Sequence, residues 1–186
     1  MTAGPSDQER FARIALSFVA EPGDPVLGAL LRASGAAEAF AMICDRRPQQ
    51  PAAESGGDGI PRLGRAIERW AARLGAVPAE SRLAAWEGAG IRVLCPGDPE
   101  WPTQLDELSD ARPLVLWLRG SADLRFACLR SVSIVGARAA TGYGQHVATE
   151  MAAALAERGF CVISGGPYSK ETPSPLGLAA ACVQPP

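Results

Sequence analysis

The residues best suited to do chemistry lie in one short string, Ser131–Gly144. Its first five residues are typical of a buried strand, and a loop of small residues then leads into a helix. The start of a helix offers free backbone N–H groups and the positive end of a dipole, which both favour a phosphate. Gly136 lets the backbone approach such a group, Arg138 supplies a planar fork for its oxygens, and Thr141 can cap the helix or bond a phosphate oxygen. The string therefore predicts a phosphate-binding loop.

A second glycine-rich strand end, Ser164-Gly165-Gly166, follows the apolar run 160–163. Open α/β sheets bind ligands at the carboxyl ends of their strands, so the two ends predict one shared phosphate cradle. The loop is not a Walker A, because no Gly-Lys-Ser/Thr follows, and Arg138 stands where the dinucleotide fingerprint needs glycine. An alternative stays open: the glycines make tight turns, and Arg138 is a solvated surface charge.

Helices and strands that position this loop are indicated by apolar spacing. Residues 8–42 predict helices, because Phe11, Ile14 and Phe18 recur at helical intervals. Further helices are expected over 62–74 and 81–87, while 48–61 has the composition of a loop or linker. Later in the chain, strand-like runs at 91–95, 114–118, 131–135 and 160–164 surround a helix over 143–158. This alternation predicts an α/β fold with a parallel sheet.

The helix over 143–158 carries its own stop signal. Val147, Met151 and Leu155 form an apolar face at intervals of four residues. Gly159 stands where a left-handed residue ends a helix, and Phe160 follows as its usual apolar contact. We therefore expect the chain to turn at once into the next strand.

Composition excludes several classes of protein. The formal net charge is -2, so nucleic acid would have to bind through a local basic cluster. No two cysteines have metal-binding or thioredoxin spacing, and the lone His146 excludes a multi-histidine metal site. Apolar neighbours predict buried free thiols in a reducing compartment for Cys95, Cys128 and Cys161.

The N-terminus also bears on location. Residues 1–9 are polar and acidic rather than basic and then apolar, which does not fit a signal peptide. No apolar run reaches the length of a membrane span. A cytoplasmic protein without a membrane partner is therefore expected.

Three ordered motifs resemble the bacterial DNA-processing protein A (DprA/Smf) family. Residues 135–144 match its phosphate motif V-G-S/A-R-x-x-T-x-Y-G. Residues 97–102 with Leu105 look like its G-D-x-x-Y/W-P-x-x-L turn, and residues 113–120 look like its P-x-x-L-x-x-R-G strand. The resemblance covers about 83–166, and the helical N-terminal part agrees more loosely.

This resemblance implies an extended Rossmann fold that binds single-stranded DNA in a basic pocket. Such proteins protect incoming DNA in natural transformation and load a RecA-type recombinase onto it. Carried over by position, the phosphate-facing residues are Gly136, Arg138 and the 164–166 turn, while Thr141 and Tyr143 support the loop. No nucleophile–base pair is evident, so neither an enzyme nor a cofactor is expected.

The implied domains are a helical SAM-like or helix-hairpin-helix-like domain over 1–80, the first half of the Rossmann domain over 81–166, and a proline-rich tail over 167–186. The family continues after the glycine turn with G-I-D and A-A-H-R-G, which this chain lacks. Five of the 16 prolines and the only lysine, Lys170, fall in the tail. We therefore hypothesise a truncated or frameshifted product.

Truncation would remove later strands and the family's dimer surface. The strand 160–164 would then have an unpaired edge, and marginal folding or aggregation would follow. Two alternatives to DNA binding stay open. One is an inactive fragment; the other is an enzyme resembling nucleotide phosphoribohydrolases, although Ser164–Pro167 lacks the Thr and Glu of their P-G-G-x-G-T-x-x-E string.

Overall fold

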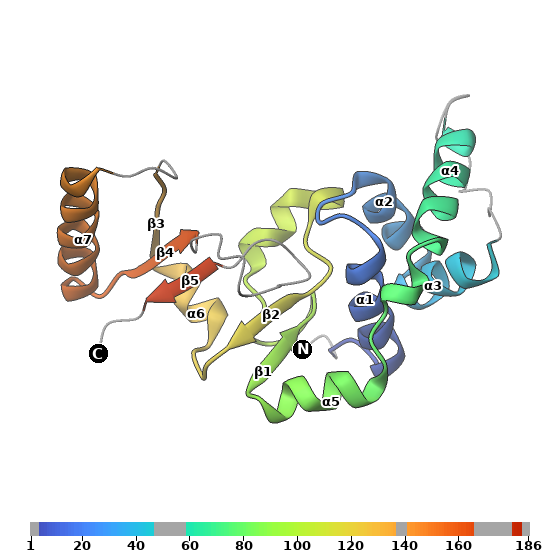
Figure 1. Ribbon diagram of the computed structural model, residues 1–186, viewed down its shortest axis with the longest axis horizontal. Helices are drawn as coiled ribbons and strands as arrows, with labels where there is room; N and C mark the ends of the chain where they lie inside the picture. Colours follow the sequence, from blue (N-terminus) through green and yellow to red (C-terminus); the bar gives the residue numbers. More distant parts are fainter. Residues whose placement is uncertain (1–3, 47–58, 137–140, 166–179, 184–186) are drawn as a thin grey trace. The chain divides into compact units, whose positions relative to one another are not determined.

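A computed structural model describes residues 4–46, 59–136, 141–165 and 180–183 (Figure 1). The fold is mixed α/β, as predicted, and forms two compact units, Met1–Ser121 and Ala122–Pro186. The domain boundary predicted at residue 80 reflects a change in sequence pattern, whereas this division reflects packing. The predicted domains therefore stay a prediction.

The first unit combines helices with a two-stranded ribbon. Its described elements are α1 (Asp7–Val19), α2 (Pro25–Ser34), α3 (Ala36–Asp45), α4 (Gly59–Ala71), η1 (Leu74–Ala76), α5 (Glu80–Gly88), β1 (Ile91–Leu94), η2 (Thr103–Ala111) and β2 (Leu116–Arg119). The helices predicted over 8–42, 62–74 and 81–87 are confirmed. Of the predicted loop 48–61, the last three residues begin α4, and 48–58 lie outside the described residues.

Side chains cap the first helices. The Ser6 hydroxyl accepts a hydrogen bond from the Glu9 amide, and the Asp24 carboxylate accepts from the amides of Val26 and Leu27. These contacts satisfy N–H groups that a helix start leaves without partners. Pro25 at the start of α2 suits its fixed φ. The local sequence thus determines where α1 and α2 begin.

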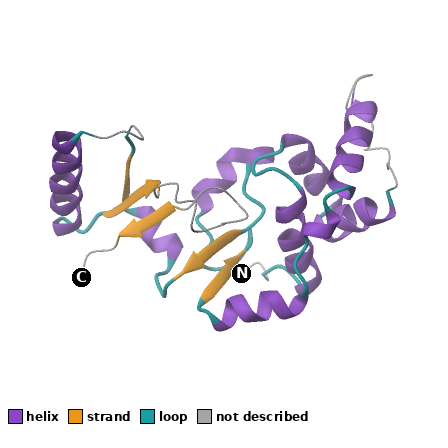
Figure 2. Cartoon of the chain, in the orientation of Figure 1, coloured by secondary structure: helices purple, strands orange, loops and turns teal. Residues whose placement is uncertain are grey.

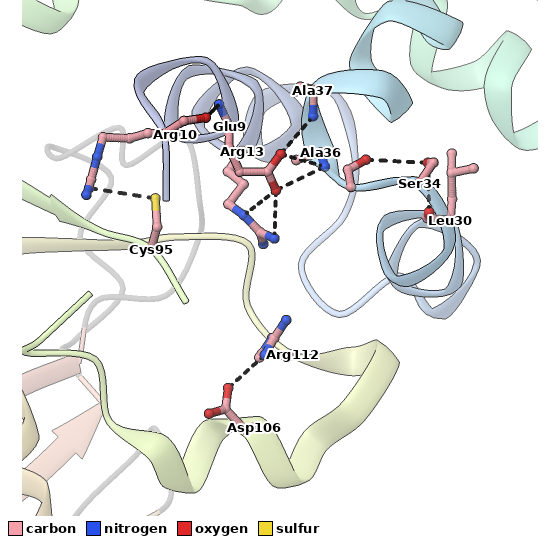
Figure 3. Close-up of polar contacts among 12 residues, drawn as sticks. Glu9, Arg10, Arg13, Leu30, Ser34, Ala36, Ala37, Cys95, Asp106 and Arg112 are labelled. Atoms are coloured by element: carbon pink, nitrogen blue, oxygen red, sulfur yellow. Dashed lines mark hydrogen bonds and ion pairs between the residues drawn. The ribbon is translucent and has the colours of Figure 1, made fainter. Parts of the chain in front are cut away.

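The start of α3 is capped from another helix. Gly35 precedes α3 and has no side chain to offer, so Glu9 of α1 accepts from the amides of Ala36 and Ala37 at 3.0 and 3.1 Å (Figure 3). Arg13 pairs with the same carboxylate at 3.0 Å. Burial acts to raise the pKa of Glu9, but the two amides and Arg13 outweigh it, and the pKa is lowered. This cap fixes α1 against α3.

The core of the first unit lies between these helices. Its most buried large side chains include Leu16, Leu27, Ile43, Ile67 and Trp70. They come from α1, α2, α3 and α4, and Ile67 and Trp70 are spaced as one face of α4. The predicted apolar faces therefore form one packed helical core.

The ribbon packs on α1. β1 pairs with β2 in antiparallel register, with Val93 opposite Trp117. Ile14 of α1 packs in one buried cluster with Cys95 and Val115 beside this ribbon. The prediction of a parallel sheet is wrong here, because the connection through η2 is not a crossover and returns the chain in the opposite direction.

The G-D-x-x-W-P turn locks the ribbon to α1. Asp98 accepts from the Cys95 amide at 2.7 Å and from two guanidinium nitrogens of Arg10 at 2.5 and 2.9 Å. Arg10 also donates to the Val93 carbonyl oxygen at 3.2 Å and contacts the Cys95 sulfur (Figure 3). Burial raises the pKa of Cys95 to about 11, so this thiol is inert at neutral pH. The motif therefore has a structural role.

The second unit contains a small mixed sheet and two helices in its described part (Figure 2). They are α6 (Leu124–Leu129), β3 (Ser131–Ile134), α7 (Gly142–Glu157), β4 (Cys161–Gly165) and β5 (Ala180–Val183). The strand order is β3-β4-β5. β3 and β4 are parallel, which confirms the predicted parallel pair, whereas β5 is antiparallel to β4.

Several expectations about the second unit are wrong. The strand at 160–164 has no free edge, because β5 from the predicted tail pairs with it. Cys161 is in a disulfide rather than free, while Cys95 and Cys128 are free thiols. The apolar face of α7 is only partly covered: Val147 and Leu155 are half-buried, and Met151 is 52% exposed. Helical spacing marks an apolar face but does not supply a neighbour to cover it.

No single helix in the described ranges has both the length and the apolar composition to cross a membrane. The adjoining helices α2 and α3 reach the required length and apolar composition only when they are counted together, and a bend of 112° separates them.

Candidate phosphate-binding edge

The parallel pairing of β3 with β4 brings two predicted site segments together. Ser131 lies opposite Cys161 and Ile134 opposite Ser164, so both strands end at the same edge of the sheet. β3 continues from there into Val135 and Gly136. The predicted juxtaposition of the two strand ends is therefore present in the fold.

Glycines at this edge leave space that the described chain does not use. A Cβ atom added at Gly136 or Gly165 would meet nothing within 4 Å. Neither residue has a positive φ, so backbone conformation does not require glycine there. Glycine at an open, unstrained strand end fits a close approach by a ligand.

Thr141 caps the helix that follows the loop. Its hydroxyl oxygen accepts a hydrogen bond from the Gly144 amide at 3.1 Å, and its carbonyl oxygen accepts from the Gln145 amide. Of the two roles predicted for this hydroxyl, the structure has the cap. The cap fixes the start of α7 immediately after the loop.

The other end of α7 is closed as the sequence predicted. Gly159 has a φ of 74° and donates to the Ala156 carbonyl oxygen, while the Phe160 amide donates to that of Leu155 at 3.0 Å. These two bonds form a Schellman motif. They turn the chain directly into β4.

Arg130 holds the junction between α7 and β4. Its guanidinium donates to the Arg158 carbonyl oxygen at 2.8 Å and lies 4.7 Å from the centre of the Phe160 ring. Its own carbonyl oxygen accepts from the Cys161 amide. A cation at a helix C-terminus complements the helix dipole. Sequence reasoning missed this residue, because its partners at the end of α7 and the start of β4 lie 28 or more residues further along the chain.

The predicted site residues are only partly within the described ranges. Gly136 and Thr141 are exposed, Ser164 is half-buried, and Gly165 is exposed at the end of β4. Arg138 and Gly166 lie outside the described residues. The fold brings the ends of β3 and β4 together, and Thr141 begins the helix between these strands.

Two side chains of the phosphate motif are largely exposed. Val135 is 87% exposed and Tyr143 is 79% exposed, although the resemblance implied that Tyr143 supports the loop. An exposed aromatic ring next to a phosphate-binding loop is able to stack on a base. Helical spacing by itself did not indicate this exposure, since the apolar Val147 lies four residues further along α7.

Other chemistry finds little support in the described ranges. They contain no group of three His, Cys, Asp or Glu residues placed to hold a metal ion. His146 lies on the exposed surface of α7, and its Nε2 is 3.3 Å from a carboxylate oxygen of Glu150. The arrangement offers backbone amides, small residues and an exposed ring.

This edge belongs to a segment with a family assignment. The sequence model of the family described as DNA recombination-mediator protein A matches residues 92–168, which contain β1 to β4 and the phosphate motif. This segment therefore matches the DprA family.

Individual relatives extend the similarity toward the N-terminus. Two Mycobacterium tuberculosis proteins named DNA processing protein DprA, from strains CDC 1551 / Oshkosh and ATCC 25618 / H37Rv, are each 37% identical to this chain over 163 residues. The alignment covers 82% of this chain and 38% of each relative. No solved structure matches the chain.

Proposed function

We propose that this chain is a DNA-processing protein that binds single-stranded DNA at the ends of β3 and β4. The observation that carries the proposal is the parallel register that places Ile134 opposite Ser164, with unfilled space at Gly136 and Gly165. Family membership of residues 92–168 supports a role in DNA recombination. The backbone at two strand ends and a helix start is suited to phosphates.

In this proposal each residue has a separate task. Gly136 and Gly165 let the DNA backbone approach, and Arg138 pairs with a phosphate. Thr141 keeps the first turn of α7 in place, as its hydrogen bond to Gly144 indicates. Tyr143 stacks on a base, which its exposure permits.

The wider roles follow from the family. The chain would assist a RecA-type recombinase in loading onto DNA in natural transformation, in the cytoplasm and without catalysis of its own. The β3-α7-β4 unit would be one part of an extended Rossmann fold, preceded by a SAM-like domain. The family's homodimer would be impaired if the later strands were missing.

Binding to a fluorescent poly-dT oligonucleotide tests the site. Arg138→Ala should weaken binding and lower the slope of log affinity against log salt by about 0.7, the value of one phosphate contact on a single strand. Tyr143→Ala should weaken binding with an unchanged salt slope, since stacking releases no counterion. Arg125→Ala is the matched control, because Arg125 is an exposed arginine of α6, the helix that precedes the start of β3 rather than its end.

Two outcomes would contradict the proposal. Binding that responds equally to the Arg138 and Arg125 substitutions would remove the loop from the site. Absence of poly-dT binding by a folded chain would instead favour the inactive fragment.

A further inference from the structure

A second basic site lies in the first unit, on α4. Arg62, Arg65 and Arg69 follow one another at intervals of three or four residues, so they share one face of the helix, and Arg73 lies in the turn just after it. The opposite side of α4 carries Leu63, Ile67 and Trp70, which are buried in the helical core. Packing therefore fixes the helix and directs the arginines outward.

These arginines border a cavity. Arg62, Arg65 and Arg69 line a space of about 530 Å³ whose opposite wall is the turn between α1 and α2, Glu21–Val26. We call this space the arginine cleft. Its walls come from helices of one compact unit.

The acidic residues of the cleft already have partners. Glu21 pairs with Arg73 at 2.7 Å, and Asp24 pairs with Arg69 at 3.6 Å. Asp24 is also occupied as the cap of α2. Among the described residues, Arg62 and Arg65 have no carboxylate partner, so these two positive charges are not compensated within that part of the chain.

The geometry suits an extended anion. At a rise of 1.5 Å per residue, the stripe from Arg62 to Arg69 is about 10 Å long. That length is sufficient for neighbouring phosphates of one nucleic acid strand to meet different arginines. Of the side chains that the structure describes, none of the large exposed apolar ones lines the cleft, so this part offers no apolar anchor of the kind that a membrane-binding surface uses.

We propose that the arginine cleft binds the phosphodiester backbone of nucleic acid, as a second site apart from the β3–β4 edge. The inference rests on the proposed DNA-processing function, because that function supplies the polyanion. Arg62 and Arg65 provide the phosphate contacts. Arg69 and Arg73 stay paired with Asp24 and Glu21 and keep those carboxylates from repelling the strand.

Poly-dT anisotropy with the full chain at 50 and 200 mM salt tests this site. Arg62→Gln/Arg65→Gln should weaken binding roughly ten- to a hundredfold at 50 mM salt and lower the salt slope by about 1.4, which is the value of two phosphate contacts. Arg62→Lys/Arg65→Lys keeps both charges and should restore most of the affinity and slope. Arg125→Gln removes a comparable exposed charge. This control should change the affinity for poly-dT and the salt slope much less than the double variant does.

The pattern of variants separates this inference from the proposed function. If Arg62→Gln/Arg65→Gln loses affinity for poly-dT and Arg138→Ala does not, the result would support the arginine cleft and remove the loop site. Loss in Arg138→Ala alone would overturn the cleft and leave the loop site intact. Equal effects of the Gln and Lys double variants would also overturn it, because a binding site for charge must respond to charge.

Free phosphate is the competing ligand of the same chemistry. Inorganic phosphate added as a competitor distinguishes the two sources. Displacement of poly-dT only at concentrations that act as general salt supports a backbone site. Displacement by submillimolar phosphate, lost in the Gln double variant, would overturn the assignment to nucleic acid and indicate a small-anion site.

Discussion

Glu9 shows how much of the helical unit can depend on one side chain. It caps α3 from α1 through the amides of Ala36 and Ala37, and it pairs with Arg13. A carboxylate that accepts two backbone N–H bonds is stabilised in its charged form. Glu9 is thus a helix cap that lies 27 residues before Ala36, whose amide donates to it.

Replacing Glu9 tests this cap. Glu9→Gln should lower the free energy of unfolding by about 1 kcal/mol at pH 7, because the charge-assisted bonds to Ala36 and Ala37 are weakened. The pKa of Glu9 is lowered in the fold, so the unfolded chain binds the proton more readily. The extra free energy of unfolding that the Glu9 carboxylate gives the wild type is therefore fully present above pH 4.5. It is lost as the pH falls through the lowered pKa of Glu9.

Urea unfolding from pH 7 to pH 3 measures the difference. Glu87→Gln serves as the control, since Glu87 is an exposed carboxylate of α5. A Glu9→Gln deficit that did not shrink toward pH 3 would argue against a carboxylate cap.

At the scale of elements, α2 and η2 are packed too closely for any side chain at Gly28. A Cβ atom there would overlap the backbone carbonyl of Asp110 in η2. Arg32 of α2 forms an ion pair with Asp110 at 2.9 Å beside this approach. Glycine inside a helix otherwise costs stability, so its presence reflects the contact.

Two alanine substitutions separate these effects. Gly28→Ala should destabilise the first unit by about 2 kcal/mol, because the backbones of α2 and η2 must move apart. Gly64→Ala in α4 should stabilise it by about 0.5–1 kcal/mol, since nothing lies within 4 Å of the added methyl group and alanine favours the helix. Thermal unfolding followed by circular dichroism compares them. Equal shifts of the two variants would show that helix propensity alone acts at Gly28.

Across the whole molecule, burial is unequally divided between the compact units. Among the described residues, the first unit contains nearly all of the buried apolar side chains, whereas the second contributes Ala127, Cys161 and Val162. The second unit also exposes Phe126, Leu129 and Met151. Apolar burial is the main favourable term in folding, so local stability should differ in the same direction.

Hydrogen exchange measures this difference. Amides of α1, α3 and α4 should exchange with the protection of global unfolding, while those of α7 and β3 should exchange at least tenfold faster. The second unit should also bind a dye such as ANS through its exposed apolar side chains. Uniform protection of both units, with one cooperative transition, would contradict this view.

Local sequence determined most of the elements and the ends of α7. Ser6, Asp24, Thr141 and Gly159 act on amides and carbonyls within a few residues, so their roles follow from the chain alone. The phosphate motif likewise indicated a strand, a loop and a helix start in that order. The family motifs also indicated that the ends of β3 and β4 lie in a segment that resembles the DprA family.

Contacts between residues that are far apart in the sequence became evident only from the tertiary structure. The antiparallel ribbon, the pairing of β5 with β4 and the cap of α3 by Glu9 all join residues far apart in the chain. The arginine cleft also appears only once α4 packs beside the α1–α2 turn. Periodicity predicts which face of an element is apolar, but burial and charge pairing are properties of two surfaces, and only packing shows which two surfaces meet.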